Sequence, residues 1–197
     1  MKTGMRTRLV GIGGLVALVI GIGAGCGEVP DNNFAQTTAD PLTARVFTLH
    51  NYQTNYCLGV RAGTPTVGTT LVVWDCDGSA NQNWQQTTLA NGLYRVKNFV
   101  ANDRCLDATR QPYGTYPKGD SVDINLCDSP TASVWDVTPA GPDLSGHPCY
   151  QFSNSYDGTV PMVMGVSAGS TARGASVIIW DDFYNANTHP DQYWCVY

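Results

Sequence analysis

Residues 59–63 read Gly-Val-Arg-Ala-Gly, and nearly the same string returns at residues 165–169 as Gly-Val-Ser-Ala-Gly. Val-Val-Trp-Asp at 72–75 returns as Ile-Ile-Trp-Asp at 178–181, again 106 residues later. The identical pairs at this offset also include Gly68 and Gly174. Self-similarity at a fixed offset indicates an architecture built from repeats.

A third, more divergent copy lies between these two. Cys-Leu-Gly-Val at 57–60 matches Cys-Leu-Asp-Ala at 105–108, and both match Val-Met-Gly-Val at 163–166. Cys76 of the first copy corresponds to Cys127, and Asp182 takes that place in the last copy. Each copy then closes on a tryptophan: Trp84, Trp135 and Trp194. The sequence therefore predicts three copies of one unit.

The units have the composition of strands. Short runs rich in Val, Ile, Leu, Tyr and Trp are bounded by Gly, Pro, Asn and Asp. Runs at 46–49, 93–96 and 149–152 open the three copies. No window after residue 43 sustains an apolar period of 3.6 over ten residues, so we expect an all-β fold with almost no helix. Each run is too short to bury a core alone, so the copies are expected to close one barrel-like sheet.

The recurring elements Cys-Leu-x-Val, Trp-x-Cys and Asn-Gln-x-Trp resemble those of the ricin-B-type β-trefoil lectins. The resemblance covers roughly residues 45–197. It implies a β-trefoil domain over 44–197 with repeats at about 44–90, 91–140 and 146–197. The copies are longer than the usual unit of the family, so extended loops are expected at 113–117 and 183–190.

The N-terminus has the pattern of an export signal. Residues 1–8 carry Lys2, Arg6 and Arg8, and residues 9–25 are uncharged and mostly apolar, which predicts a signal peptide over 1–25. A retained transmembrane span is the alternative, but the many glycines make a poor helix and the run is short for a bilayer.

Gly-Ala-Gly-Cys at 23–26 resembles a bacterial lipoprotein cleavage site, although the family pattern prefers leucine where Gly23 stands. We therefore expect Cys26 to carry lipid and residues 26–43 to form a flexible tether. This places the domain in a bacterial cell envelope, lipid-anchored, or in secreted form. The alternative is ordinary signal cleavage nearby, with Cys26 left as a free thiol.

Without Cys26, six of the seven cysteines remain, an even set typical of disulfides. The resemblance pairs Cys57 with Cys76 and Cys105 with Cys127. The third copy instead has Cys149 and Cys195, which we expect to bond because the first and last strands of a trefoil unit can be neighbours. No Cys-x-x-Cys or Cys-x-x-His motif occurs, so neither a metal site nor a cofactor is expected.

Sugar binding needs an aromatic face for the apolar side of the ring, and amides or carboxylates for its hydroxyls. The resemblance implies an Asp after Cys-Leu, an aromatic two residues before the second cysteine position, and the Asn of Asn-Gln-x-Trp. The neighbouring Gln mostly supports that Asp and the fold.

No copy carries the complete set. Gly59 and Gly165 stand at the Asp position of the first and third copies, and Ala132-Ser133 replace the amide pair of the middle copy. The remaining candidates are Trp74, Asn81 and Gln82; Asp107 and Asn125; and Trp180, Asp191 and Gln192. We expect binding in the first and third copies and not in the middle one.

Several of these residues have a structural alternative. The three closing tryptophans are expected to be core residues. Trp74 and Trp180 are either binding surfaces or covers of the barrel, and Asp107 either binds or only caps a turn. The three histidines stand alone, with no set of nucleophile, base and orienting group.

The function expected from this reading is non-catalytic carbohydrate binding. Sixteen acidic against eleven basic residues, a formal charge of −5 with no basic cluster, argue against nucleic-acid binding. The first alternative is an envelope interaction or structural module that has lost sugar binding, since the Asp position is glycine twice. The second alternative is a hydrolytic enzyme, which would need paired carboxylates in a cleft, and a lone trefoil offers little for that. The sequence does not specify the oligomeric state.

Overall fold

The computed structural model describes residues 45–101, 103–108, 118–128, 132–154, 161–183 and 186–197, all within one compact unit. These ranges contain twelve β-strands, four single turns of 3-10 helix and no α-helix. None of their helical segments has the length and apolar character needed to cross a bilayer.

Each copy contributes four strands. The first copy forms β1 (Val46–Asn51), β2 (Cys57–Val60), β3 (Thr69–Trp74) and β4 (Asn83–Thr88). The middle copy forms β5 (Tyr94–Asn98), β6 (Arg104–Ala108), β7 (Val122–Leu126) and β8 (Asp136–Pro142). The third copy forms β9 (Pro148–Asn154), β10 (Met162–Val166), β11 (Val177–Asp181) and β12 (Trp194–Val196). The helical turns are η1 (Arg61–Gly63), η2 (Ala80–Gln82), η3 (Ser167–Gly169) and η4 (Pro190–Gln192).

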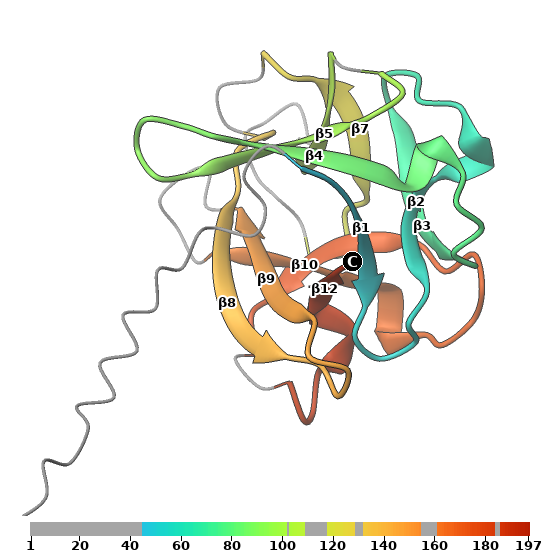
Figure 1. Ribbon diagram of the computed structural model, residues 1–197, viewed down its shortest axis with the longest axis vertical. Helices are drawn as coiled ribbons and strands as arrows, with labels where there is room; N and C mark the ends of the chain where they lie inside the picture. The colour runs from blue at the N-terminus through green and yellow to red at the C-terminus, as the bar shows by residue number, and fades with distance from the viewer. Residues whose placement is uncertain (1–44, 102, 109–117, 129–131, 155–160, 184–185) are drawn as a thin grey trace, which may run out of the picture. The chain divides into compact units, whose positions relative to one another are not determined.

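The first and last strands of the copies close a six-stranded ring. β12 pairs with β1, β1 with β4 and β4 with β5, all antiparallel. On the other side, β8 runs along β9, and β9 pairs with β12 (Figure 1). A bridge between Tyr94 and Trp135 closes the ring between β5 and the start of β8.

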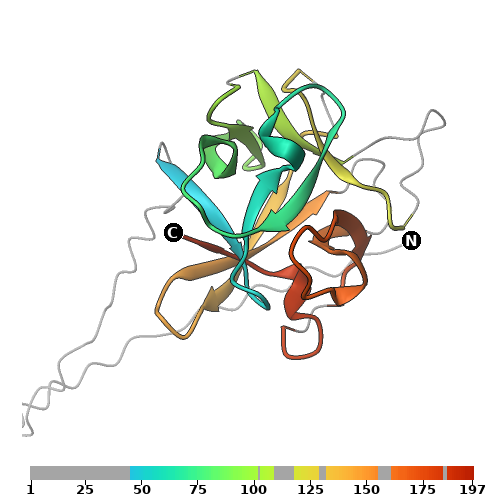
Figure 2. The same ribbon diagram turned by 90° about the vertical axis from the view of Figure 1, so that its right-hand side faces the viewer.

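The two middle strands of each copy form a hairpin: β2–β3, β6–β7 and β10–β11. The hairpins meet one another through β3–β7 pairing and through the bridges Val72–Ser176 and Ser121–Ile178. Figure 2 shows the first hairpin with η1 and η2 beside it. A six-stranded ring with three hairpins in pseudo-three-fold repetition is a β-trefoil, which confirms the all-β expectation.

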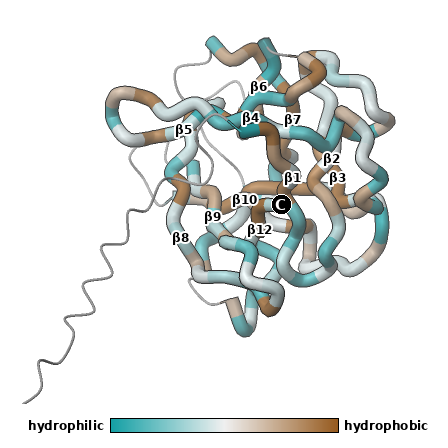
Figure 3. The backbone as a smooth tube through the Cα atoms, in the orientation of Figure 1, coloured by the Kyte–Doolittle hydropathy of each residue, from teal (hydrophilic) through white to brown (hydrophobic). Residues whose placement is uncertain are grey.

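The three closing tryptophans lie in the core, as expected: Trp84, Trp135 and Trp194 are 0% exposed. Each indole Nε1–H donates to a main-chain carbonyl at the same place in its own copy. The acceptors are Leu58 (3.1 Å), Leu106 (3.0 Å) and Met164 (3.0 Å). Hydrophobic stretches of β1, β2, β10 and β12 meet near the centre of Figure 3. The closing tryptophan thus both fills the core and positions the inner hairpin strand.

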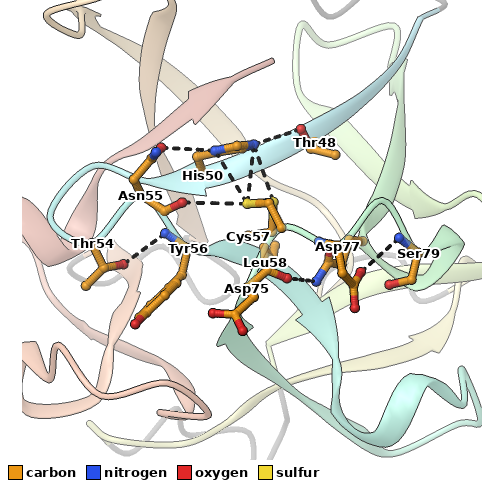
Figure 4. Close-up of a disulfide and its surroundings, with 12 residues drawn as sticks. Thr48, His50, Thr54, Asn55, Tyr56, Cys57, Leu58, Asp75, Asp77 and Ser79 are labelled. Atoms are coloured by element: carbon orange, nitrogen blue, oxygen red, sulfur yellow. Dashed lines mark hydrogen bonds between the residues drawn. A yellow bond between two sulfur atoms is a disulfide. The ribbon is translucent and has the colours of Figure 1, made fainter.

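Three disulfides link Cys57 to Cys76, Cys105 to Cys127 and Cys149 to Cys195, the pairs expected from the alignment of the copies. The first two close β2–β3 and β6–β7, and the third joins β9 to β12, which are hydrogen-bonded neighbours. In the chain-entropy model, each bridge stabilises the fold by about 3 kcal/mol. His50 lies against the first bridge, with hydrogen bonds to Thr48 and Asn55 (Figure 4).

Candidate functional site

The first copy forms a surface hollow of about 350 Å³ that Trp74 lines at the end of β3. Trp74 is 38% exposed, unlike the three core tryptophans. Gly59 of β2 and Asn81 of η2 lie in the same wall, and Gly174 of the third copy completes it. We call this the first hollow. It brings together Trp74, Asn81 and Gln82 as the sequence predicts.

The third copy forms the equivalent hollow, larger at about 700 Å³. Trp180, at the same place in β11, is also 38% exposed. Asp191 and Gln192 of η4 line it, and the stacked rings of Phe183 and His189 add an aromatic wall, with centroids 4.0 Å apart. We call this the third hollow. Both hollows lie on the two copies in which we expected binding.

The glutamine of each motif holds the loop that follows the exposed tryptophan. Gln82 Nε2 donates to the Asp75 carbonyl at 2.7 Å, and its Oε1 accepts from the Asp77 amide at 3.2 Å. Gln192 repeats this with the Asp181 carbonyl at 2.7 Å and the Phe183 amide at 3.4 Å. Both glutamines are 1% exposed, so their main contribution is to the shape of the hollow.

The glycines at the expected Asp position leave room for the motif side chains. A Cβ on Gly59 would stand 3.2 Å from Gln82 Cγ and 3.4 Å from Asn81 Nδ2. A Cβ on Gly165 would stand 3.1 Å from Gln192 Cγ and 3.3 Å from Asp191 Oδ2. Both glutamines are pinned by their hydrogen bonds and cannot easily move aside. In the third hollow, the Asp191 carboxylate therefore lies next to the place where a side chain at residue 165 would begin.

A buried asparagine from the next copy holds each motif turn from below. The three asparagines are 0–3% exposed, and each donates to a main-chain carbonyl of the neighbouring copy. Their Nδ2 bonds are Asn98 to the Asn81 carbonyl (3.1 Å), Asn51 to that of Asp191 (2.9 Å) and Asn154 to that of Ala132 (3.1 Å). These bonds fix the main-chain positions of Asn81 and Asp191 in their hollows.

A glycine from a neighbouring copy supports the strand that carries each exposed tryptophan. The Gly174 amide donates to the Val73 carbonyl at 2.8 Å, and the Gly119 amide to that of Ile179 at 2.9 Å. A Cβ on Gly174 would be 3.1 Å from Trp74 Cζ3, and one on Gly119 would be 3.3 Å from Trp180 Cζ3. The first hollow is therefore assembled from two copies, and the third from all three, because Gln53 of the first copy also lines it.

The residue before each of these glycines is basic and forms an ion pair with the aspartate that follows the exposed tryptophan. Arg173 lies over Trp74, with its Cζ 4.1 Å from the ring centroid, and its Nη1 is 2.8 Å from Asp75 Oδ2. Lys118 makes the equivalent ion pair with Asp181 beside Trp180. Exposed pairs of this kind contribute about 1 kcal/mol or less, so their main effect is to order the rim.

Each hollow is also lined by an alanine in a left-handed backbone conformation: φ is +57° at Ala62 and +55° at Ala168. Such angles cost a non-glycine residue roughly 1 kcal/mol. A glycine follows each alanine, also at positive φ, in η1 and η3. The same strained turn is therefore kept in both hollows, and its methyl group lies in the wall.

The two hollows differ in their carboxyl groups. Partial burial raises the pKa of Asp191 above its usual value, because the carboxylate loses part of its solvating water. Hydrogen bonds from the hydroxyl and amide of Ser79 lower the pKa of Asp77 at the rim of the first hollow. Hydrogen bonds thus favour the anion of Asp77, whereas at Asp191 the effect of burial outweighs a main-chain hydrogen bond and the nearby His189, which both favour the anion.

The middle copy is built differently. Asp107 is 2% exposed and lies opposite Asp123, which is 5% exposed, in the β6–β7 ladder. Burial, reinforced by the neighbouring charge of Asp123, raises the pKa of Asp107 to about 7. Asn125 stands at the tryptophan position and caps its own strand, its Oδ1 accepting from the Leu126 amide at 2.8 Å. The structure does not bring these two candidates to an exposed aromatic side chain among the described residues.

Sequence reasoning missed the contributions from neighbouring copies. Gly174 was visible as a repeated glycine, but alignment of the copies does not reveal that it contacts Trp74. Phe183 and His189 fall in the stretch identified only as an extended loop. Cys26 and the loop at 113–117 lie outside the described residues.

The comparisons with known proteins agree with the β-trefoil fold. The model of the family described as ricin-type β-trefoil lectin domain matches residues 45–194. No protein among the curated sequences matches the chain.

Three solved structures illustrate the similarity in fold. A designed three-fold symmetric protein, ThreeFoil, aligns with a TM-score of 0.63 at 19% identity, over 77% of this chain and 96% of its own. The exo-β-1,3-galactanase of Clostridium thermocellum aligns with 0.64 at 20%, over 78% of this chain but only 30% of the galactanase. The C-half of an earthworm R-type lectin in complex with GalNAc aligns with 0.51 at 15%, over 77% and 97%. At these identities the likeness concerns the fold.

Proposed function

We propose that this chain, which belongs to the ricin-type β-trefoil lectin domain family, binds carbohydrate without catalysing a reaction. Binding takes place in the first and third hollows. In each, the exposed tryptophan offers an aromatic face to the apolar side of a sugar ring. Asn81 in one hollow and Asp191 in the other offer polar atoms to its hydroxyls.

One observation carries the proposal. Two segments 106 residues apart build equivalent hollows, each with a partly exposed tryptophan beside Asn81 or Asp191. In each hollow a buried glutamine bonds the loop after the tryptophan, and a buried asparagine bonds the main-chain carbonyl of Asn81 or Asp191. A ligand that covers the exposed part of the tryptophan ring would gain about 1–3 kcal/mol from its burial. Two weak sites on one domain also gain avidity on a polymer that reaches both.

The same hollows support a non-catalytic role. Glycoside hydrolysis uses two carboxylates flanking the scissile bond. Within the described residues, Asp77 is the carboxylate that lines the first hollow and Asp191 the one that lines the third. The further acids beside the exposed tryptophans, Asp75 and Asp181, are held in ion pairs with Arg173 and Lys118.

We further propose that the domain is exported and anchored through lipid on Cys26 to a bacterial cell envelope. The apolar leader and Gly-Ala-Gly-Cys at 23–26 motivate this, and three disulfides suit an oxidising compartment. Fractionation of cells tests the anchor: wild type should sediment with membranes and Cys26→Ser should be soluble. Equal solubility of both would refute it.

A glycan array probed with the labelled chain tests carbohydrate binding. The proposal predicts retention on a related set of saccharides, competed by the free sugar. The alternative, an interaction module that has lost sugar binding, keeps its motivation from Gly59 and Gly165 at the Asp position. An array with no specific signal would favour that alternative.

A further inference from the structure

The first and third hollows share one frame but present different charges. The amides of Asp77 and Phe183 both donate to the motif glutamine, which shows that these two residues occupy equivalent places. The imidazole of His189 stands in the third hollow where the first has Ser79, each at the N-terminus of its helical turn. The hollows also differ in charge at Arg61 against Ser167, Asp77 against Phe183, and Asn81 against Asp191. An arginine, an aspartate and an amide thus become a hydroxyl, an aromatic ring and a carboxylate.

The first hollow is electrically balanced. Arg61 and Asp77 are the ionisable groups in its wall. Arg61 is tied to two hydroxyls, with Nε 3.0 Å from Thr70 Oγ1 and Nη2 3.0 Å from Ser176 Oγ. Asn81 is neutral, and its Nδ2 donates to the Val60 carbonyl at 3.4 Å. This wall offers hydroxyl-binding groups with no net charge.

The third hollow carries a carboxylate with no ion pair among the described residues. Asp191 and His189 are the ionisable groups in its wall, and His189 is stacked on Phe183. The nearby cation Lys118 is already paired with Asp181. A half-buried carboxylate beside aromatic rings is the arrangement that binds an ammonium group, through a charge-assisted hydrogen bond and attraction to the ring faces.

We infer that the third hollow takes a sugar bearing a protonated amine, a 2-amino-2-deoxy sugar, whose ammonium group bonds the Asp191 carboxylate while its ring lies against Trp180. The first hollow, with Asn81 in the equivalent place, does not discriminate in favour of the amine. The inference rests on the proposed carbohydrate binding and names the chemical class of one of its two ligands.

Nuclear magnetic resonance titration resolves the two hollows separately. The indole N–H signals of Trp74 and Trp180 in the full chain are assigned with Trp74→Phe and Trp180→Phe. The probes are glucosamine and galactosamine, their N-acetylated forms, and glucose and galactose, at about pH 7, where an amine of ordinary basicity is mostly protonated. N-acetylation removes the charge and keeps the ring.

The Trp180 signal should report an affinity roughly fivefold higher for an amino sugar than for its N-acetylated or neutral counterpart, as expected for one partly exposed ion pair. The preference should shrink in high salt. Asp191→Asn should abolish it, whereas Asp136→Asn, which removes a charge from exposed β8 outside both hollows, should keep it. Asn81→Asp should create the preference at Trp74.

Three results would overturn the inference: an amine preference that survives Asp191→Asn, a Trp180 signal that responds equally to charged and neutral sugars, or one that responds to none of the six. Equal response would leave carbohydrate binding intact and remove the charge selectivity. If no probe moves either indole signal, the inference falls, and the glycan array decides the proposed function separately.

Discussion

The ring of Trp74 lies against Gly174 of the third copy, so closely that a Cβ at residue 174 would stand 3.1 Å from Trp74 Cζ3. The same glycine donates its amide to the carbonyl of Val73, the residue before the tryptophan. The orientation of the first hollow's aromatic face therefore depends on a neighbouring copy. An isolated repeat would not possess this hollow.

Gly174→Ala should weaken binding at the first hollow, because the new methyl group displaces the Trp74 ring. Gly68→Ala is the matched control: φ is +82° at Gly68 and +83° at Gly174, but a Cβ on Gly68 would meet no described atom within 4 Å. Both variants should lose about 1 kcal/mol of stability through backbone strain. Calorimetric titration should find weaker binding only in Gly174→Ala; equal loss in both would mean that strain alone decides.

The buried asparagines predict site-selective effects. Asn98→Ala removes the donor to the Asn81 carbonyl, so it should impair the first hollow. Asn51→Ala should impair binding at the third hollow. Asn154 donates to the middle copy, so Asn154→Ala should impair binding at neither hollow. Each should cost about 1 kcal/mol of stability, the typical contribution of one hydrogen bond, since it removes the donor to a main-chain carbonyl. Denaturant unfolding and titration with sugar check the two effects; a binding loss in Asn154→Ala would contradict the assignment.

Asp107→Asn should stabilise the domain at neutral and alkaline pH. The pKa of Asp107 is about 7 in the fold, against an ordinary value of 3.8, so the folded state binds more protons between these pH values. Stability therefore falls as pH rises from about 4 to about 7. The neutral amide of Asn removes this penalty. It should therefore raise the free energy of unfolding by at most about 4 kcal/mol at pH 8 and by little at pH 3.

Urea unfolding across this pH range measures the effect. Asp136→Asn, an exposed change of equal charge, should retain the wild-type pH dependence. If the stability of Asp107→Asn falls with pH as steeply as that of the wild type, the buried pair Asp107 and Asp123 is not its cause.

The tryptophans should separate into two classes. Trp84→Ala removes a fully buried ring and the indole bond to the Leu58 carbonyl, so it should cost about 3–5 kcal/mol of stability. Trp74→Ala truncates a ring that is 38% exposed and should cost far less. Thermal melts compare them; similar losses would mean that Trp74 covers the barrel instead of serving a ligand.

The repeat in the sequence predicts much of the fold because each unit carries its own closing tryptophan and cysteines at fixed spacing. The core positions of Trp84, Trp135 and Trp194 also follow from their place in the unit, whereas for Trp74 and Trp180 the sequence leaves both a binding surface and a cover of the barrel open. The contact of Gly174 with Trp74 could not be predicted from the sequence, because it joins two copies about a hundred residues apart. Likewise, the environment of Asp107 depends on β7, the strand that pairs with it, because this strand places Asp123 opposite Asp107.

The measurement that tests the central claim most directly is titration of the Trp74→Ala/Trp180→Ala double variant with a saccharide identified on the array. Each truncation should remove about 1–3 kcal/mol of stacking, a loss of roughly tenfold to a hundredfold in affinity at its hollow. The account predicts that binding of the double variant falls below detection, while its thermal melt stays close to that of the wild type. Unchanged affinity in a folded double variant would place the binding site outside the two hollows and contradict the account.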